Sequence, residues 1–255
     1  MSGTGRTDDG RGRGLGNLLS GLAVAVGCVL FLGGFAWGAV EYKPYTVPTQ
    51  SMNPTVKAGD RVLAQRIDGA DVKRGDVVIF KDKVWGDVPM VKRVVGIGGD
   101  TVKCCDQGGK LTVNGQAIDE PYLHNTAPST TKFSATVPKD QLFLLGDERD
   151  VSLDSRVHLE DAANGSVPRS AVSARVDAVA WPLDGMLKHP TGFKALPGGI
   201  SQPGPLMLVV DAVVAGAVLI VVGAAYGPLA RRLGRRGAGK RGGGAVGREV
   251  PVAGQ

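Results

Sequence analysis

Two apolar runs, one near each end of the 255-residue chain, constrain most strongly how it can fold. The first covers residues 18–40 and contains no charged side chain, and the second covers residues 206–226. At 1.5 Å per residue, each run is long enough as a helix to cross a hydrocarbon layer of about 30 Å. Both are therefore predicted to be transmembrane helices, which leaves residues 41–205 as the water-soluble part.

The first run could instead belong to a cleavable signal peptide. The apolar core of a signal peptide usually has about 7–15 residues, whereas this run has 23, and no clean A-x-A cleavage site follows it. An uncleaved anchor is therefore favoured. Residues 1–17 are Gly-rich and polar, and they are predicted to form a disordered cytosolic lead.

The distribution of charge predicts the orientation in the membrane. Residues 41–205 hold 20 Lys and Arg against 20 Asp and Glu, whereas residues 231–255 hold 7 basic residues and one Glu. Basic residues beside a membrane segment mark its cytoplasmic side. We therefore expect a multi-pass cell-membrane protein with both termini cytoplasmic, including a basic tail over residues 227–255, and with residues 41–205 extracytoplasmic. The lipid bilayer is the expected partner, and nucleic acid is not, because the net charge of +6 comes from the tail.

Cysteines and histidines are too few and too scattered to predict a metal site or another cofactor. The sequence has three of each and no Cys-x-x-Cys pair. Cys28 lies in the first apolar run, and Cys104 and Cys105 are adjacent. Because disulfide geometry favours well-separated Cα atoms, we expect Cys104 and Cys105 to be free or partly buried thiols.

Residues 41–205 have the pattern of an all-β domain. Short apolar runs alternate with Gly and Pro turn signals, and Asn114-Gly115 between two alternating runs is a strong hairpin signal. The pattern predicts antiparallel sheets with a small, barrel-like arrangement. The Ser- and Thr-rich residues 126–135 are expected to be a loop, and residues 182–202 a linker. The predicted strands cover residues 61–67, 75–80, 88–95, 99–102, 111–118 (a hairpin), 141–145 and 171–181.

Ser51 is the candidate nucleophile. It lies in the stretch Pro-Thr-Gln-Ser-Met-Asn-Pro-Thr over residues 48–55. The two prolines remove backbone donors and restrict φ on either side of Ser51, which predicts ordered, non-helical chain. A serine hydroxyl is a weak nucleophile unless a neighbouring base accepts its proton.

Lys92 is the candidate base. On a strand over residues 88–95 it shares a face with Met90 and Val94, whereas Arg93 points the other way. Apolar neighbours lower the pKa of an amine, and a shift from about 10.4 to about 7–8 costs roughly 3–5 kcal/mol, which burial can impose on lysines. The alternative is a surface strand whose lysine lies in water.

A third stretch, Gly-Asp-Glu-Arg-Asp-Val-Ser-Leu-Asp-Ser-Arg over residues 146–156, follows the apolar residues 142–145. It is therefore expected to be a loop that leaves a buried strand. Taken alone, it could be a self-bonded turn with surface ion pairs.

Together, these stretches resemble the conserved boxes of the type I signal peptidases, membrane-bound bacterial Ser/Lys serine proteases that cut leader sequences from exported proteins. The resemblance covers roughly residues 18–181, behind an N-terminal anchor. The matching stretches, in the family's order, are P-T-Q-S-M-N-P-T, G-D-R-V-L, R-G-D-V-V-I-F, V-K-R-V-V-G-I-G-G-D and G-D-E-R-D-V-S-L-D-S-R.

The resemblance implies that Ser51 is the nucleophile and Lys92 the general base. It implies that the Ser51 N–H and the Thr49 hydroxyl form an oxyanion hole for the charge that develops on the scissile carbonyl. It also implies that Ser152 orients the lysine.

The resemblance matches further charged residues to the support of the site. Asp154 and Arg156 match an ion pair, and Asp147 and Arg149 fall in the same box. Two positions depart from the family, because Glu148 and Val151 stand where Asn is frequent. The resemblance also implies exported preproteins as substrates, cleavage after small residues, no cofactor and no metal, and an all-β catalytic domain whose apolar edge rests on the membrane.

Three other functions fit parts of the sequence. Ser129-Thr-Thr-Lys132 matches the S-x-x-K signature of penicillin-binding enzymes, but that signature needs a helix and later S-D-N and K-T-G elements, which the sequence lacks. A membrane-anchored β module could bind exported chains or lipid without cutting them, although intact Ser51, Lys92 and Ser152 argue against this. Self-cleaving Ser/Lys repressors share related chemistry but would need a DNA-binding domain in place of the anchor.

Overall fold

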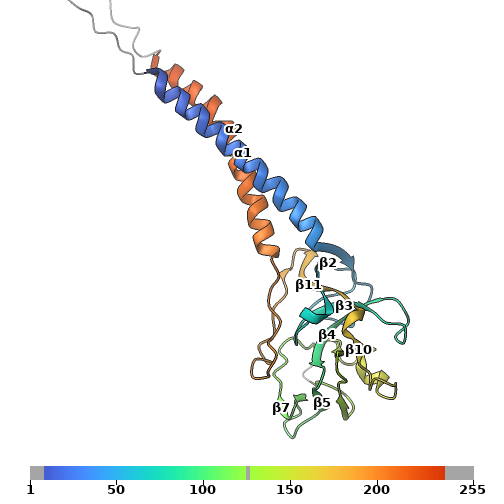
Figure 1. Cartoon of the computed structure of the whole chain (residues 1–255). Coiled ribbons are helices and arrows are strands. Elements are labelled where there is room, and N and C mark those ends of the chain that lie inside the picture. Colours follow the sequence, from blue (N-terminus) through green and yellow to red (C-terminus); the bar gives the residue numbers. More distant parts are fainter. Residues whose placement is uncertain (1–8, 125–126, 239–255) are drawn as a thin grey trace, which may run out of the picture. The chain divides into compact units, whose positions relative to one another are not determined.

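The computed structural model describes residues 9–124 and 127–238, which form two compact units (Figure 1). One unit contains most of two long terminal helices. The other unit, residues 38–206, contains the strands.

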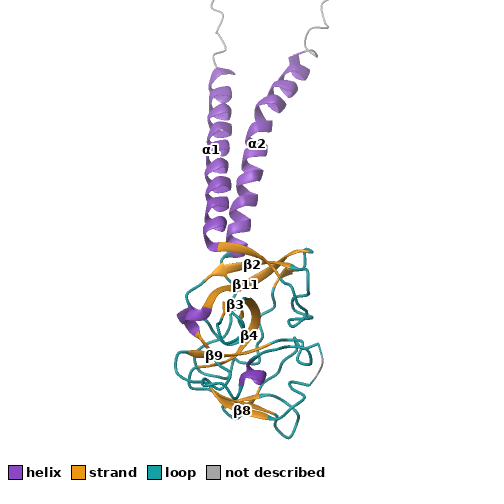
Figure 2. Cartoon of the chain, turned by 90° about the vertical axis from the view of Figure 1, so that its right-hand side faces the viewer, coloured by secondary structure: helices purple, strands orange, loops and turns teal. Residues whose placement is uncertain are grey.

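The two helices contain the predicted apolar runs. Helix α1 (Asp9–Glu41) and helix α2 (Leu206–Ala238) lie side by side (Figures 1 and 2). A Cβ added to Gly27 of α1 would come within 2.8 Å of the carbonyl oxygen of Gly216 in α2, so the helices meet at glycines. By length and composition, Gly16–Glu41 and Leu206–Tyr226 are suited to cross a membrane.

Both helices extend beyond the apolar runs. Residues 9–17, which were expected to be disordered, belong to α1, and residues 227–238 of the expected tail belong to α2. Once a helix has formed, each added residue gains a hydrogen bond for little further cost, so the helix can continue into polar sequence. The rest of the predicted lead and tail, residues 1–8 and 239–255, lies outside the described residues.

Residues 38–206 form antiparallel sheets, which confirms the predicted all-β class. In the described part of the chain there are two sheets, one large and one small (Figure 2). The large sheet contains, in spatial order, β1 (Tyr42–Thr46), β2 (Arg61–Arg66), β11 (Val172–Trp181), β3 (Val77–Lys81), β4 (Pro89–Ile97), β9 (Gln141–Leu145) and β10 (Val167–Pro168), with β12 (Gly185–Met186) paired to β11. The small sheet contains β7 (Gln116–Ala117), β6 (Thr112–Val113), β5 (Thr101–Cys104) and β8 (Phe133–Thr136). Short 3-10 helices are η1 (Gly69–Asp71), η2 (Ser155–His158) and η3 (Arg169–Ala171).

The small sheet shows one prediction that was confirmed and one that was not. Asn114 and Gly115 join β6 to β7 with φ values of 54° and 79°, the left-handed region that a two-residue hairpin turn needs. Strand β8, however, begins inside residues 126–135, which were expected to be a loop. Phe133 and Ala135 alternate with exposed Ser134 and Thr136, so burial of one face favours the strand despite its polar composition.

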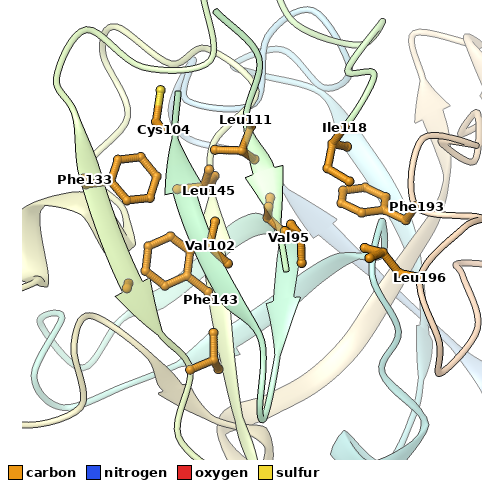
Figure 3. Packing of buried hydrophobic residues seen from close by; sticks show 13 residues of the cluster. Val95, Val102, Cys104, Leu111, Ile118, Phe133, Phe143, Leu145, Phe193 and Leu196 are labelled. Carbon is orange, nitrogen blue, oxygen red and sulfur yellow. The ribbon is translucent and has the colours of Figure 1, made fainter. Parts of the chain in front are cut away.

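The segment expected to be a linker packs onto the domain. Phe193 and Leu196 are buried in the same cluster as Val102 and Phe143 (Figure 3). Removal of these apolar side chains from water holds residues 182–202 against the strands. The interpretation of this segment as a plain linker was therefore wrong.

Cys104 and Cys105 are joined by a disulfide bond, so the expectation of free thiols was also wrong. That expectation used the Cα separation usual for disulfides. Here the sulfurs belong to consecutive residues whose Cα atoms are 3.0 Å apart. Cys104 is buried in the cluster of Figure 3, and Cys28 is free.

Candidate active site

Ser51 lies in a tight turn between β1 and β2. The Asn53 N–H donates to the Gln50 carbonyl at 2.9 Å, which closes a four-residue turn with Ser51 in its second position. The next side chain, Met52, is fully buried in the core beside this turn. The turn therefore fixes the backbone on the C-terminal side of Ser51.

Strand β4 places Lys92 against this serine. The Lys92 Nζ donates to the Ser51 Oγ at 2.7 Å, across 41 positions of sequence. Lys92 is only 5% exposed, so the alternative of a lysine in water is excluded. Burial lowers the pKa of Lys92 to about 8, in the direction expected from its apolar neighbours, while the charges of Asp154 and Asp147 act against this shift and that of Arg156 adds to it.

Two hydrogen-bond donors lie beside the nucleophile. The Thr49 Oγ1 is 3.3 Å from the Ser51 Oγ, and either hydroxyl can donate to the other. Within residues 9–124 and 127–238, the Ser51 N–H has no acceptor. Both donors are therefore able to bind an oxygen that approaches Ser51.

Arg93, the next residue of β4, is buried in an ion pair that sequence reasoning missed. Its Nε donates to the Asp147 Oδ1 at 2.8 Å, and its Nη2 donates to the Asp147 Oδ2 at 2.6 Å. The Thr55 hydroxyl donates to the same carboxylate at 2.5 Å, and the Tyr122 ring lies 4.0 Å from the guanidinium. Burial acts to lower the pKa of Arg93, but the charge of Asp147 and the hydrogen bonds to it outweigh burial and raise that pKa.

The loop after β9 contains two more pairs. The Asp154 Oδ1 accepts from the Arg156 Nε at 2.8 Å, and the Asp154 Oδ2 accepts the Gly146 N–H at 3.0 Å. Arg149 pairs with Glu120 at 2.6 Å, rather than with a carboxylate of its own loop. Glu120 lies after β7 and no local motif marked it.

Ser152 is buried close to the nucleophile turn. A Cβ added to Gly146 would lie 2.1 Å from the Ser152 Oγ and 2.4 Å from the Ser51 carbonyl oxygen, so only glycine fits between them. Among the described residues the Ser152 hydroxyl has no hydrogen-bond partner, and thus makes no bond to Lys92 in this structure.

The two positions that depart from the family differ in their contacts. The Glu148 N–H donates to the Ser51 carbonyl at 3.1 Å, and the Glu148 Oε2 accepts from the Asn53 Nδ2 at 2.6 Å. Val151 is 62% exposed. Of the two, Glu148 contacts the turn that carries the nucleophile.

Other site types receive little support. In the part of the chain that the structure describes, no three His, Cys, Asp or Glu side chains are grouped so as to hold a metal ion. Ser129 and Lys132 lie in irregular chain rather than on the helix that the S-x-x-K signature requires.

Known proteins provide a separate comparison. The family model described as signal peptidase, peptidase S26, matches residues 17–181. Signal peptidase IB of Staphylococcus aureus is 32% identical over 181 residues, which cover 64% of this chain and 88% of that protein. A Mycobacterium leprae protein named "Probable signal peptidase I" is 32% identical over 199 residues, covering 55% of this chain and 68% of its own. A crystal structure of a signal peptidase I from Enterococcus faecalis aligns with 46% of this chain and 97% of its own, at 26% identity and a TM-score of 0.34.

Proposed function

Because the chain belongs to the signal peptidase family, peptidase S26, we propose that it removes signal peptides from exported preproteins with Ser51 as nucleophile and Lys92 as general base. The observation that supports this dyad most strongly is the buried 2.7 Å contact between the Lys92 Nζ and the Ser51 Oγ. With a pKa of about 8, Lys92 is partly uncharged at mildly alkaline pH and can accept a proton.

In the first half of the reaction, the Lys92 amine takes the Ser51 proton as the Ser51 Oγ attacks the scissile carbonyl. The Ser51 N–H and the Thr49 hydroxyl donate to the oxyanion of the tetrahedral intermediate. The C–N bond then breaks, and the Lys92 ammonium gives its proton to the leaving amine of the mature protein. The signal peptide remains bound to Ser51 as an ester.

In the second half, Lys92 takes a proton from a water molecule that attacks this ester. The second tetrahedral intermediate uses the same two donors. It collapses to release the signal peptide with a free carboxyl group, and the Ser51 Oγ recovers its proton from Lys92. One lysine therefore acts as base and acid in both halves.

The remaining predicted residues act by positioning. The buried Ser152 hydroxyl is available to orient the Lys92 amine when the serine proton moves. Asp147, Arg149, Asp154 and Arg156 are each held in a charged pair. These pairs hold the loop of residues 146–156 beside the dyad and transfer no proton.

The open edge of β4 is the proposed binding site for the extended substrate. Strand β9 pairs with β4 only from Arg93 onward, so among the described residues the edge from Pro89 to Lys92 has no neighbouring strand on that side. A peptide paired to this edge would pass beside the dyad. Cleavage after small residues is proposed from the family resemblance.

The membrane orientation is also a proposal. The two apolar helices are compatible with membrane association, and the basic C-terminal flank supports cytoplasmic termini, with residues 41–205 outside. Protease added to intact spheroplasts should then digest the domain and spare the C-terminal tail. Digestion of the tail with protection of the domain would reverse the orientation.

The proposed activity is tested with the purified full chain in detergent and an exported preprotein. Mass spectrometry should find a new N-terminus directly after a small residue. Replacing that small residue by Phe or Arg should stop cleavage. Equal cleavage of the original and altered preproteins would remove the signal-peptidase assignment for this chain.

A further inference from the structure

The turn that carries Ser51 is tied to the loop after β9 at three points. The Glu148 N–H donates to the Ser51 carbonyl at 3.1 Å. The Thr55 hydroxyl donates to the Asp147 Oδ2 at 2.5 Å, and the Asn53 Nδ2 donates to the Glu148 Oε2 at 2.6 Å. Glu148 therefore holds this turn through both its backbone and its side chain.

The two side-chain ties differ in how they are supported. The Asp147 carboxylate is fully buried and is also bound by Arg93, so this tie belongs to a larger ion pair. The Glu148 side chain is 13% exposed, and among the described residues it has no Lys or Arg within ion-pair distance. Its close partner is the neutral Asn53 amide, and the His124 Nδ1 lies farther away, at 3.9 Å. A short bond from an amide to a carboxylate is charge-assisted and stronger than a neutral bond.

The position of Asn53 makes this bond relevant to the nucleophile. The Asn53 N–H closes the turn by donating to Gln50. The Asn53 Nδ2 donates to Glu148 at 2.6 Å and lies at the longer distance of 3.3 Å from the His124 Nδ1, so Glu148 is its closer partner. Ser51 lies inside that turn, and its Oγ must stay at 2.7 Å from the Lys92 Nζ. A shift of the turn would change this distance and the direction of the Ser51 N–H together.

We propose that Glu148 is a positioning residue for peptide cleavage, whose carboxylate fixes Asn53 and thereby aligns the Ser51 hydroxyl with Lys92. The inference rests on the proposed function. It gives a role to a residue at which the chain departs from the family pattern. It also predicts that kcat depends on having one carboxylate and one amide in contact at positions 53 and 148, whichever of the two positions carries the carboxylate.

Exchange of the two groups tests this directly. Asn53→Asp alone places two carboxylates in contact, and Glu148→Ala alone removes the acceptor. Because misplacement by about 1 Å can reduce a rate by up to about 100-fold, each should lower kcat by roughly 10- to 100-fold. The double variant Asn53→Asp/Glu148→Gln restores a carboxylate and an amide with their positions exchanged. It should recover most of the kcat that Asn53→Asp loses.

The readout separates positioning from folding and from substrate binding. The full-length variants are compared in detergent with one preprotein, and the expected loss lies in kcat while KM stays within about threefold of the parent value. Glu148→Gln retains an acceptor oxygen and should fall between the parent and Glu148→Ala. Glu160→Ala, which removes an exposed carboxylate beyond η2, is the matched control and should keep the parent kcat.

The outcomes distinguish this inference from the proposed function. If Ser51→Ala still cleaves the preprotein, the proposed function fails. If Ser51→Ala is inactive but Glu148→Ala retains the parent kcat, only the positioning role fails. A double variant no more active than Asn53→Asp would also overturn it. If Glu148→Ala does not fold, the comparison of Asn53→Asp with Asn53→Asp/Glu148→Gln still tests the positioning role, because both variants keep two polar side chains in contact.

Discussion

The two neighbouring cations of β4, Lys92 and Arg93, are both buried but lie in opposite electrostatic settings. Arg93 faces a carboxylate that it binds through two parallel hydrogen bonds, and its pKa is raised. Lys92 faces a serine hydroxyl, and its pKa is lowered to about 8 because burial outweighs the more distant carboxylates. One strand therefore presents a permanent charge on one side and a titratable amine on the other.

The difference shows how a buried lysine can keep a lowered pKa although a carboxylate lies nearby. A carboxylate in contact stabilises the charged form of a base, whereas desolvation alone favours the neutral form. The Asp147 carboxylate accepts hydrogen bonds from Arg93 and Thr55 rather than from Lys92. The Arg93 pair thus keeps a nearby carboxylate in place while the lysine remains free to lose its proton.

The largest expected effect comes from making Lys92 resemble Arg93. Lys92→Arg keeps the positive charge, but a guanidinium does not deprotonate in a protein and cannot accept the Ser51 proton. Cleavage should fall by on the order of 10⁴-fold or more, as in Ser51→Ala, because dyad members act as a unit. Both variants should still fold. Substantial cleavage by Lys92→Arg would show that another group is the base.

The next effect concerns the other cation and should appear in stability. Asp147→Ala leaves Arg93 buried without its carboxylate, and loss of one partner of a buried pair costs about 3–5 kcal/mol. Unfolding in detergent should therefore begin at a much lower temperature. Asp184→Ala, which removes an exposed carboxylate, is the control and should unfold with the parent. An unchanged midpoint for Asp147→Ala would mean that the pair contributes little.

Removal of the Ser152 hydroxyl should have a smaller effect, and this effect should appear in the activity that depends on Lys92 and not in stability. If this hydroxyl orients the amine during proton transfer, Ser152→Ala should lower kcat by about 10- to 100-fold, within the range that general acid–base catalysis contributes. Thermal unfolding should change little, because the hydroxyl has no partner among the described residues. A kcat equal to that of the parent would leave Ser152 without a role in orienting Lys92.

The smallest expected effect is a shift in pH dependence. The charge of Asp154 raises the pKa of Lys92, against the effect of burial. Asp154→Asn removes that charge, so the amine should lose its proton at lower pH and the acid limb of kcat/KM should move to lower pH. A shift to higher pH, or none in an enzyme that is otherwise active, would contradict the assignment of Lys92 as the titrating group.

The sequence predicted what local patterns determine. Alternation along the strand predicted that Lys92 and Arg93 point to opposite faces, and the two side chains bind different partners, Ser51 and Asp147. Turn chemistry located the hairpin at Asn114. It could not predict the partner of Arg93, because Asp147 lies 54 positions away on a loop that only the fold brings back. For the same reason Glu120 was not recognised as the partner of Arg149.

Composition was misleading where one buried face decided the structure. The polar residues before Phe133 suggested a loop, although Phe133 itself begins a strand. Residues 182–202 resembled a linker, although Phe193 is buried in the same cluster as Ile118 and Leu196 (Figure 3). In both segments, burial of a few apolar side chains determined the structure more than the average polarity of the segment did.

The pH dependence of kcat/KM tests the central claim most directly, since it reports the pKa of the essential base in the free enzyme. The purified full-length parent should show a single acid limb with a midpoint near pH 8, because only the uncharged Lys92 amine accepts the Ser51 proton. A midpoint near that of an ordinary lysine, at about 10.4, would mean that burial does not prepare the base. A midpoint near 6.5 would point to a histidine instead and would contradict the Ser51–Lys92 dyad.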